Sequence, residues 1–208
     1  DIYIGAGTTF SHITNDPVIQ ENIPVLGEAV DQVGGPQIRN IGTIGGNICN
    51  GAVSADSAPT VFSLNALLRI EDGNNGRTVP VRDFYLGPGR VDLKRGEILT
   101  HVIIPAKEYQ GYHGNYIKYS MRKAMDIATL SCSVVSKVNT EKNILEDVRI
   151  TFGVAAPVPF RCEKTEAALK GQEISEKLYE KTEQSIRQEI NPRDSWRAVS
   201  YTHLTLPP

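Results

Sequence analysis

The chain has 208 residues, of which 40% are apolar and 22% are charged, a balance typical of a folded globular protein and not of a disordered one. With 22 Lys and Arg against 24 Asp and Glu, it lacks the basic excess that binding to a nucleic-acid backbone requires. No apolar stretch reaches the length of a membrane span, and the first residues, DIYIGAGTTF, lack the basic and apolar regions of a signal peptide. The composition predicts a soluble protein without nucleic-acid or membrane partners.

The cysteines give no support to a metal site or a disulfide framework. They are odd in number and far apart, at Cys49, Cys132 and Cys162, and none belongs to a C-x-x-C pair or lies at ligand spacing from a histidine. We therefore expect no resident metal and a reducing, intracellular compartment.

The first 36 residues predict a short strand followed by helices. Residues 2–4 are an apolar strand, and Asp16 followed by Pro17 is a typical N-cap and first helical residue. From Pro24 the apolar residues recur at helical spacing until Gly-Gly-Pro at 34–36 ends the pattern.

Residues 34–59 read GGPQIRNIGTIGGNICNGAVSADSAP, a segment rich in glycine and almost without charge. It has too little periodicity for a helix and too many breaks for a long strand. We predict an ordered loop region here.

The rest of the first half predicts a small antiparallel sheet. A short apolar helix is expected at 60–67, then a hairpin whose strands, 68–70 and 78–81, flank the turn at 72–76. A further strand is expected at 97–104, before Pro105.

The second half predicts a separate subdomain after a linker at 106–114. The elements expected beyond the linker are three strands and two helices, at 115–120, 129–138, 147–155, 163–170 and 175–189. The predicted fold class is α+β, without an internal repeat.

The segment from Thr43 to Asn47 is the strongest candidate binding site. The glycine pair Gly45 and Gly46 lets successive backbone amides turn inward and approach an anion, while the flanking hydroxyl and amide side chains add donors. The segment follows neither the Rossmann nor the P-loop pattern, and an ordinary tight turn has similar residues.

Two single residues could contribute to the same kind of site. Asp56 could accept hydrogen bonds from ribityl or ribose hydroxyls or from a ring N–H, or it could cap the helix that follows Pro59. Lys118 could lie at a ligand, or it could be an ordinary edge-strand lysine. Hydrolase and metalloprotease motifs are absent from the sequence.

Four segments, GPQIRN, TIGGNICNGAVSADSAP, EILTHVIIP and KYSMRKAMDIA, together resemble, in order and spacing, the FAD-binding subunit of molybdenum hydroxylases. The likeness is greatest to the bacterial xanthine dehydrogenase type and covers residues 1–198. It implies the second subdomain of a PCMH/VAO-type FAD-binding fold at 1–105, with the first subdomain missing, and a C-terminal α+β subdomain at 111–198 like that of CO dehydrogenase flavoproteins. Residues 199–208 depart from the family and are expected to be a non-native tail.

The resemblance also implies which residues bind FAD, and it implies no catalytic or metal-binding residue. The FAD-binding positions carried over are Thr43, Ile44, Gly45, Gly46, Asn47, Asn50, Asp56, Leu99 and Lys118. The amides at 45–47 would compensate the diphosphate, and Lys118 would lie near the N1–C2=O edge of the flavin and raise its potential. Residues 119–129 match a loop beside the flavin ring that affects access of the electron acceptor.

In that family a molybdopterin-binding large subunit hydroxylates the substrate and a small subunit relays electrons through [2Fe–2S] clusters to FAD and then NAD⁺. The resemblance thus implies a cytoplasmic electron-transfer subunit, with xanthine or hypoxanthine oxidised on the partner. A carbon monoxide, nicotinate or aromatic acyl-CoA enzyme remains an alternative. So does a fragment that no longer binds FAD and serves only as an interaction module.

Overall fold

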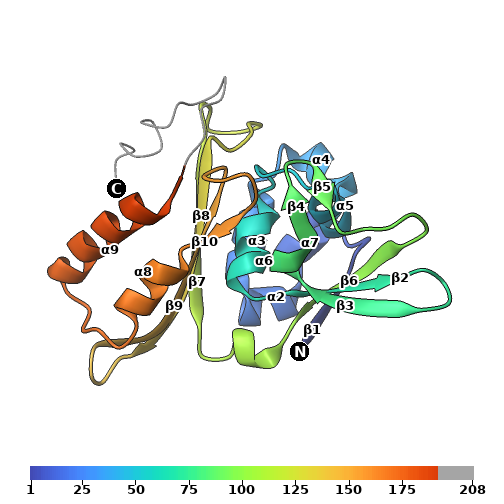
Figure 1. Cartoon of the computed structure of the whole chain (residues 1–208). Helices are drawn as coiled ribbons and strands as arrows, with labels where there is room; N and C mark the ends of the chain where they lie inside the picture. The colour runs from blue at the N-terminus through green and yellow to red at the C-terminus, as the bar shows by residue number, and fades with distance from the viewer. Residues whose placement is uncertain (192–208) are drawn as a thin grey trace.

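Two four-stranded antiparallel sheets lie on opposite sides of a short central helix, α6 (Ser57–Ser63), in the computed structural model (Figure 1). The structure describes residues 1–191. The expected tail at 199–208, and the last residues of the expected second subdomain, lie outside the described residues.

The first sheet confirms the predicted hairpin and strands. Its spatial order is β1, β6, β2, β3, with bounds Ile2–Gly5, Ile98–Ile104, Leu67–Glu71 and Gly76–Pro80. Between β3 and β6 the chain forms three elements that the sequence did not predict: α7 (Val81–Phe84), β4 (Tyr85–Gly87) and β5 (Arg90–Val91).

Helices cover the first sheet, and those that begin at Pro17 and Pro24 start where the sequence predicts. The covering helices are α1 (Phe10–Asn15), α2 (Pro17–Asn22) and α3 (Pro24–Asp31). Asp16 caps α2 as expected, since its Oδ1 accepts from the backbone N–H of Val18 at 2.9 Å and of Ile19 at 3.3 Å.

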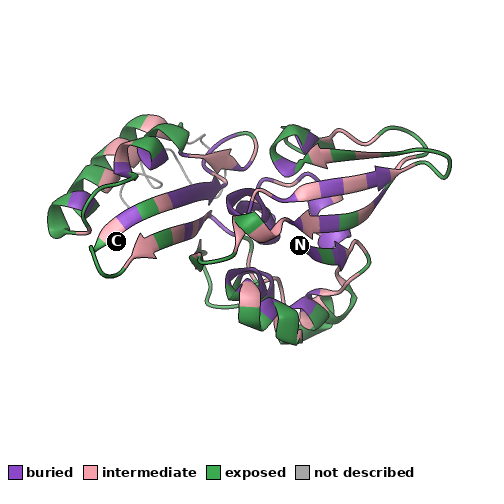
Figure 2. Cartoon of the chain, turned by 90° about the horizontal axis from the view of Figure 1, so that it is seen from below, coloured by how far each residue is buried: buried purple, intermediate pink, exposed green. Residues whose placement is uncertain are grey.

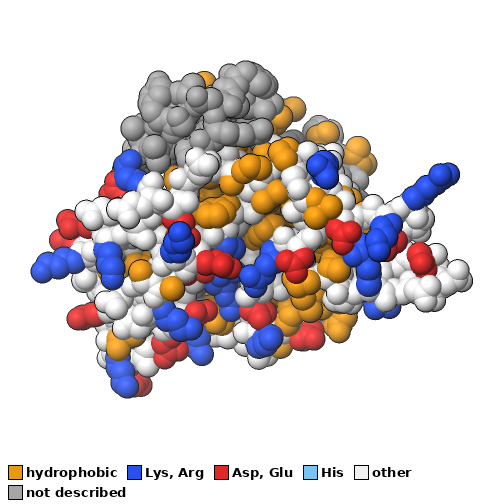
Figure 3. All heavy atoms as spheres, in the orientation of Figure 1, with side chains coloured by type: hydrophobic (Ala, Val, Ile, Leu, Met, Phe, Trp, Pro, Cys, Tyr) orange, Lys and Arg blue, Asp and Glu red, His pale blue; other side chains and the backbone are white. Residues whose placement is uncertain are grey.

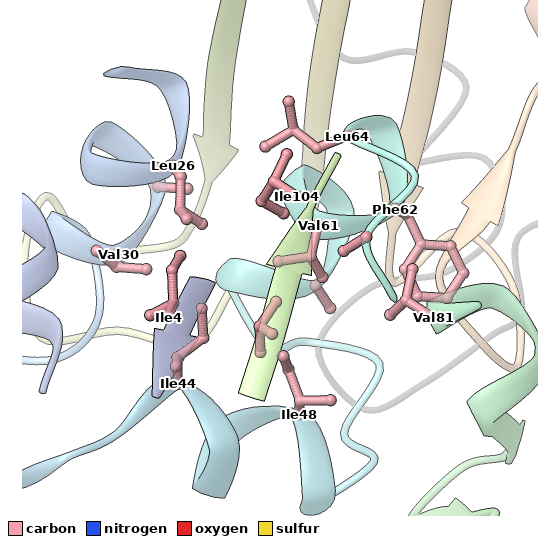
Figure 4. Close-up of a cluster of buried hydrophobic side chains, with 14 of the residues drawn as sticks. Ile4, Leu26, Val30, Ile44, Ile48, Val61, Phe62, Leu64, Val81 and Ile104 are labelled. Atoms are coloured by element: carbon pink, nitrogen blue, oxygen red, sulfur yellow. The ribbon is translucent and has the colours of Figure 1, made fainter. Parts of the chain in front are cut away.

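The predicted loop at 34–59 is wrong, because most of it is helical. It contains α4 (Pro36–Ile41) and α5 (Ile44–Cys49), and α6 begins at Ser57, three residues earlier than expected. Each of the two short helices lasts only six residues, too few for a hydrophobic period to be recognised. Burial stabilises α5, whose Ile44 and Ile48 enter the main core beside Ile4 (Figure 4).

The second sheet also has the predicted strands, with a fourth short one added. Its order is β10, β9, β8, β7, with bounds Phe160–Arg161, Ile144–Gly153, Leu130–Asn139 and His113–Tyr119. The linker before β7 contains a single 3₁₀ turn, η1 (Ala106–Glu108). The helices α8 (Glu163–Leu169) and α9 (Glu176–Glu189) lie on the side of this sheet away from α6 (Figure 1).

Because β9 is covered on both sides, its alternation separates two cores. Val148, Ile150 and Phe152 enter the smaller apolar cluster under α8 and α9, whereas Arg149 and Thr151 bond to residues of α6 and its surroundings. Figure 2 shows the buried strands of both sheets and the more exposed surfaces of α8 and α9. In residues 1–191 no helix has the length and apolar character needed to cross a bilayer.

Candidate functional site

The loop that enters α5 is fixed by its own cap and by the core. Thr43 is the N-cap of α5, and its Oγ1 accepts from the Gly46 N–H at 3.1 Å. The next residue, Ile44, is fully buried with Ile48 (Figure 4). The loop therefore has a defined shape before any ligand binds.

The expectation that the amides of residues 45–47 turn together toward an anion needs correction. The Gly45 N–H donates to the Ala6 carbonyl at 2.9 Å, and the Asn47 N–H donates to the Thr43 carbonyl at 3.0 Å. The Gly46 N–H is bonded to a side-chain hydroxyl, which can rotate away in favour of a ligand oxygen. One amide, and not three, is therefore suited to an anion.

The two glycines have different reasons to be glycine. A Cβ on Gly45 would lie 2.5 Å from the Cβ of Ala6 and 2.7 Å from its carbonyl oxygen, so Gly45 is needed for packing. A Cβ on Gly46 would meet only Thr43 Oγ1, at 3.1 Å, and Gly46 is exposed. The absent side chain of Gly46 thus leaves room for a ligand at the surface.

Asp56 and Lys118 form a buried ion pair between the two halves of the chain. Lys118 Nζ, on β7, lies 2.8 Å from Asp56 Oδ2, and the two side chains are 6% and 8% exposed. Tyr116 donates its hydroxyl to Asp56 Oδ1 at 2.9 Å, and Lys118 also donates to the Gln32 carbonyl at 2.9 Å.

The alternative roles considered for these two residues are therefore wrong. Asp56 precedes α6, yet within the described residues its side chain makes no capping hydrogen bond to that helix. Although β7 is an edge strand, the Lys118 ammonium is buried and paired and does not lie in solvent.

Burial has the largest effect on the carboxylate of this pair. It raises the pKa of Asp56 above the ordinary value, while the hydrogen bonds and charge of Lys118 act in the opposite direction. Burial and the neighbouring Asp56 carboxylate also raise the pKa of the Tyr116 hydroxyl, which stays protonated as a donor. A charged pair held out of water in this way is costly, which makes it a candidate for a functional role.

A hydrogen bond joins the α5 loop to the ion pair. Asn47 Oδ1 accepts from Ser57 Oγ at 2.7 Å, and Ser57 directly follows Asp56. Among the described residues the other side-chain group of this amide, Nδ2, donates to no protein atom and is available to a ligand. Two regions that the sequence could only name separately therefore form one site.

Leu99 and Asn50 lie at the border of this site. Leu99 is 5% exposed, so only its backbone could contact a ligand, and the next residue, Thr100, accepts at 2.8 Å from the N–H of Ala6. Since Ala6 also packs against Gly45, β6 lies close to the α5 loop. Asn50 is exposed at the C-terminal end of α5, where its N–H donates to the Gly46 carbonyl.

The segment after Lys118 lines a cavity of about 500 Å³ together with Gln32 and Arg39. Arg122 and Asp126 close this loop on itself, because Asp126 accepts from the Arg122 N–H at 2.9 Å. Exposed apolar side chains border the cavity, and in Figure 3 hydrophobic side chains gather near the top of the molecule, where Figure 1 places α4 and this loop. The exposed apolar residues of this region are Ile38 and Ile41 of α4 and Met121, Met125 and Ile127 of the loop, of which Met121 and Met125 line the cavity.

Nothing in the described part of the chain resembles a metal centre. Residues 1–191 contain no group of three or more His, Cys, Asp or Glu side chains placed to hold an ion. The cysteines are free thiols, and burial raises the pKa of Cys132 to about 12.

Sequence reasoning missed some partners of the ion pair. Tyr116 lies two residues before Lys118 on a strand, so both side chains point to the same face, and that spacing could have predicted a shared partner. The contributions of Gln32 and Ser57 depend on contacts between segments, for which the sequence contains no signal.

Both halves of the chain match known families. Residues 1–107 match the family described as FAD binding domain in molybdopterin dehydrogenase, and residues 115–201 match CO dehydrogenase flavoprotein C-terminal domain. These matches confirm the family resemblance and the α+β fold that the sequence predicted.

Similar proteins span most of this chain. The xanthine dehydrogenase FAD-binding subunit of Escherichia coli O157:H7 is 39% identical over 98% of this chain and 69% of its own length. The glyceraldehyde dehydrogenase medium chain of Sulfolobus acidocaldarius is 29% identical over 96% of this chain and 69% of its own length. Among solved structures, carbon monoxide dehydrogenase from Hydrogenophaga pseudoflava matches with a TM-score of 0.90 at 30% identity, over 97% of this chain and 69% of that one.

Proposed function

The chain belongs to the FAD-binding subunits of the molybdenum hydroxylases, and we propose that it passes electrons from [2Fe–2S] clusters through FAD to NAD⁺ in the oxidation of xanthine or hypoxanthine. The proposed partners are a molybdopterin-binding large subunit and a [2Fe–2S] small subunit. We further propose two subdomains, 1–105 and 111–198, acting in the cytoplasm.

The observation that carries this proposal is the continuous site from the α5 loop to the Asp56–Lys118 pair. Its outer end offers the Thr43 hydroxyl, the Gly46 amide and the Asn47 Nδ2 group, which are suited to diphosphate and ribityl oxygens. Its inner end offers one buried ammonium group. FAD, when bound, supplies both two-electron and one-electron transfer.

Lys118 is the residue that we propose lies beside the flavin ring. Its fixed positive charge would stabilise negative charge on the N1–C2=O edge, and Asp56 holds the ammonium group in place through the 2.8 Å contact. The loop at 119–129 would then form the approach for the electron acceptor. Lys123 and Arg122 in that loop suit the phosphates of NAD⁺.

The substrate is proposed from the resemblance to a xanthine dehydrogenase subunit. This subunit does not contact the substrate in the proposed arrangement, so a carbon monoxide, nicotinate or aromatic acyl-CoA enzyme stays an alternative. The molybdopterin subunit decides between these substrates. Isolating the complex and assaying it with each of them tests the choice.

The alternative that the chain is an interaction module without FAD has its own test. The flavin content of the purified 208-residue chain is measured by absorbance and by release of FAD on denaturation. Stoichiometric FAD would exclude the interaction-module alternative.

The binding site itself is tested by Gly46→Val in the flavoprotein subunit that contains this sequence. We expect FAD affinity, measured by quenching of flavin fluorescence, to fall at least about tenfold, since the new side chain fills the space left for the ligand. The chain should still fold, because the one atom close to the new Cβ is the Thr43 hydroxyl, at 3.1 Å, and a side-chain hydroxyl can shift by a few tenths of an ångström.

Gln37→Val is the matched control, since it places the same β-branched residue on an exposed position of the neighbouring helix α4. Equal FAD affinity in Gly46→Val and Gln37→Val would contradict the assignment of the α5 loop.

A further inference from the structure

The second sheet holds α6 at both of its ends. At the N-terminal end, Tyr116 and Lys118 of β7 bond to Asp56, the residue before the helix. At the C-terminal end a different strand of the same sheet makes the contacts, and its principal residue is Arg149 of β9.

Arg149 is a buried arginine with several partners across the boundary between the two halves. Its side chain is 7% exposed, and its guanidinium donates to the Ser63 carbonyl at 3.2 Å and to the Glu108 carbonyl at 3.0 Å. It also pairs with the Glu108 carboxylate at 3.0 Å and lies over the ring of Tyr112, 4.4 Å from its centre. Ser63 is the last residue of α6, where the carbonyl groups have no backbone partners within the helix. The Arg149 guanidinium therefore binds at the negative end of the helix dipole.

A second arginine from this sheet supports the same end. Arg161 of β10 donates to Asn65 Oδ1 at 2.9 Å, and Asn65 Nδ2 donates to Glu108 Oε2 at 2.8 Å. Asn65 follows the helix in a left-handed conformation with φ of 45°. The chain that leaves α6 is therefore held in one geometry.

Between its ends, α6 has little freedom to move. All seven of its residues are buried, and Ser63 Oγ lies 2.8 Å from Thr151 Oγ1 of β9. A helix of this length is about 10 Å long and behaves as a rigid rod, so a shift of its C-terminal end also displaces its first residues.

We propose that Arg149 is a positioning residue for the Asp56–Lys118 pair. By fixing the C-terminal end of α6 against the second sheet, Arg149 holds Asp56 within reach of the Lys118 ammonium at the other end. Arg149 does not touch the proposed flavin site, and it acts through the helix.

The test measures how well Lys118 is protected in the 208-residue chain. Lys118 is acetylated under limiting reagent and quantified by mass spectrometry, with the more exposed Lys137 of β8 as internal reference. We expect Arg149→Met to speed labelling of Lys118 about tenfold relative to Lys137, because the helix end loses charge-assisted hydrogen bonds. Arg149→Lys, which keeps the charge but lacks the forked donor, should give a smaller increase.

The matched control is Arg77→Met, which removes another arginine paired with two carboxylates, those of Asp92 and Glu97 in the first half of the chain. Its Lys118 labelling should equal that of the unchanged chain. If Arg149→Met does not fold, Arg149→Lys takes its place as the test variant, since it lacks the forked donor that reaches both the Ser63 and the Glu108 carbonyls. Unchanged labelling of Lys118 in the folded variant would overturn the proposal.

A second measurement, made on the complete complex, rests on the proposed function. The reduction potential of bound FAD should shift in Arg149→Met in the same direction as in Lys118→Met, and it should stay constant in Arg77→Met. If labelling of Lys118 rises while the potential does not move, the coupling through α6 stands and the proposed role of Lys118 at the flavin fails.

Discussion

At the scale of single residues, the behaviour of a carboxylate depends on the groups that surround it. Asp56 has Lys118 and Tyr116 as partners, whereas Glu97 has Arg77 and the backbone N–H of Lys94. The first cluster is buried and joins the two halves, and the second closes the loop beside the β2–β3 hairpin. The two carboxylates therefore have opposite shifts: burial raises the pKa of Asp56, whereas hydrogen bonds from Arg77 lower the pKa of Glu97.

The Glu97 cluster predicts a measurable dependence of stability on pH. Hydrogen bonds from Arg77 lower the pKa of Glu97 from 4.5 to about 2. Because the folded value is the lower one, the stabilisation is complete above about pH 4.5 and is lost as the pH falls toward 2. We expect the difference in unfolding free energy between the unchanged chain and Glu97→Gln to be constant at neutral pH and to shrink below pH 4.5.

Urea unfolding at several pH values gives this difference. Glu21→Gln, which removes a carboxylate of α2 distant from the cluster, reports the background. A difference that stays the same down to pH 2.5 would contradict the role of Arg77.

At the scale of elements, short helices in this protein depend on caps and on burial. The six-residue helices α4 and α5 are below the length at which an isolated helix is stable, and α5 relies on the Thr43 cap and two buried isoleucines. α8 is capped from outside, since Glu189 at the end of α9 accepts from the N–H groups of Lys164 and Thr165. A carboxylate at a helix N-terminus is favoured by its unpaired amides and by the helix dipole.

Removing the Glu189 carboxylate should destabilise the packing of α8 against α9. Glu189→Ala should lower the free energy of unfolding by about 1 to 2 kcal/mol, because the two amides and the Thr165 hydroxyl lose their acceptor. Urea denaturation of both chains measures this difference in the free energy of unfolding.

Glu183→Ala on the same helix is the control, as its exposed pair with Arg187 should contribute less than about 0.5 kcal/mol. Equal losses in the two variants would show that Glu189 acts as an ordinary surface residue.

At the scale of the whole molecule, the contact between the halves is made by small residues. Gly153 of β9 faces α6, where a Cβ would lie 2.4 Å from Ser131 Oγ and 3.1 Å from Pro59 Cγ. Ser133 and Thr151 are likewise fully buried in this contact. Small side chains allow helix and sheet to approach closely, which sets the geometry of the Asp56–Lys118 pair.

A larger side chain at the contact between α6 and the second sheet should weaken the packing of the two halves. Gly153→Ala is expected to lower the free energy of unfolding by about 1 to 3 kcal/mol, since Ser131 and Pro59 cannot both give way. Thermal and urea unfolding measure this loss. Gly7→Ala is the control, because a Cβ there would have no atom within 4 Å. Equal stability of both variants would contradict close packing at this contact.

The sequence by itself determined the longer strands of both sheets, the helices that begin at Asp16–Pro17 and Pro24, the α+β class and the family. These features depend on local patterns, namely alternation, helical spacing, caps and a specific motif, which can be recognised in a single amino-acid sequence. Short helices such as α4 escaped prediction because six residues contain too little of a period.

Only the tertiary structure decided how the candidate site is assembled. It showed that the Gly45 and Asn47 amides are already bonded, that Asp56 pairs with Lys118, and that the second sheet holds both ends of α6. These contacts join residues far apart in the chain, such as the pair 56 and 118 or 63 and 149, and they form only when the two sheets pack against one helix. Local sequence patterns contain no information on such pairings, because the pairings depend on packing between elements and not on the preference of any single segment.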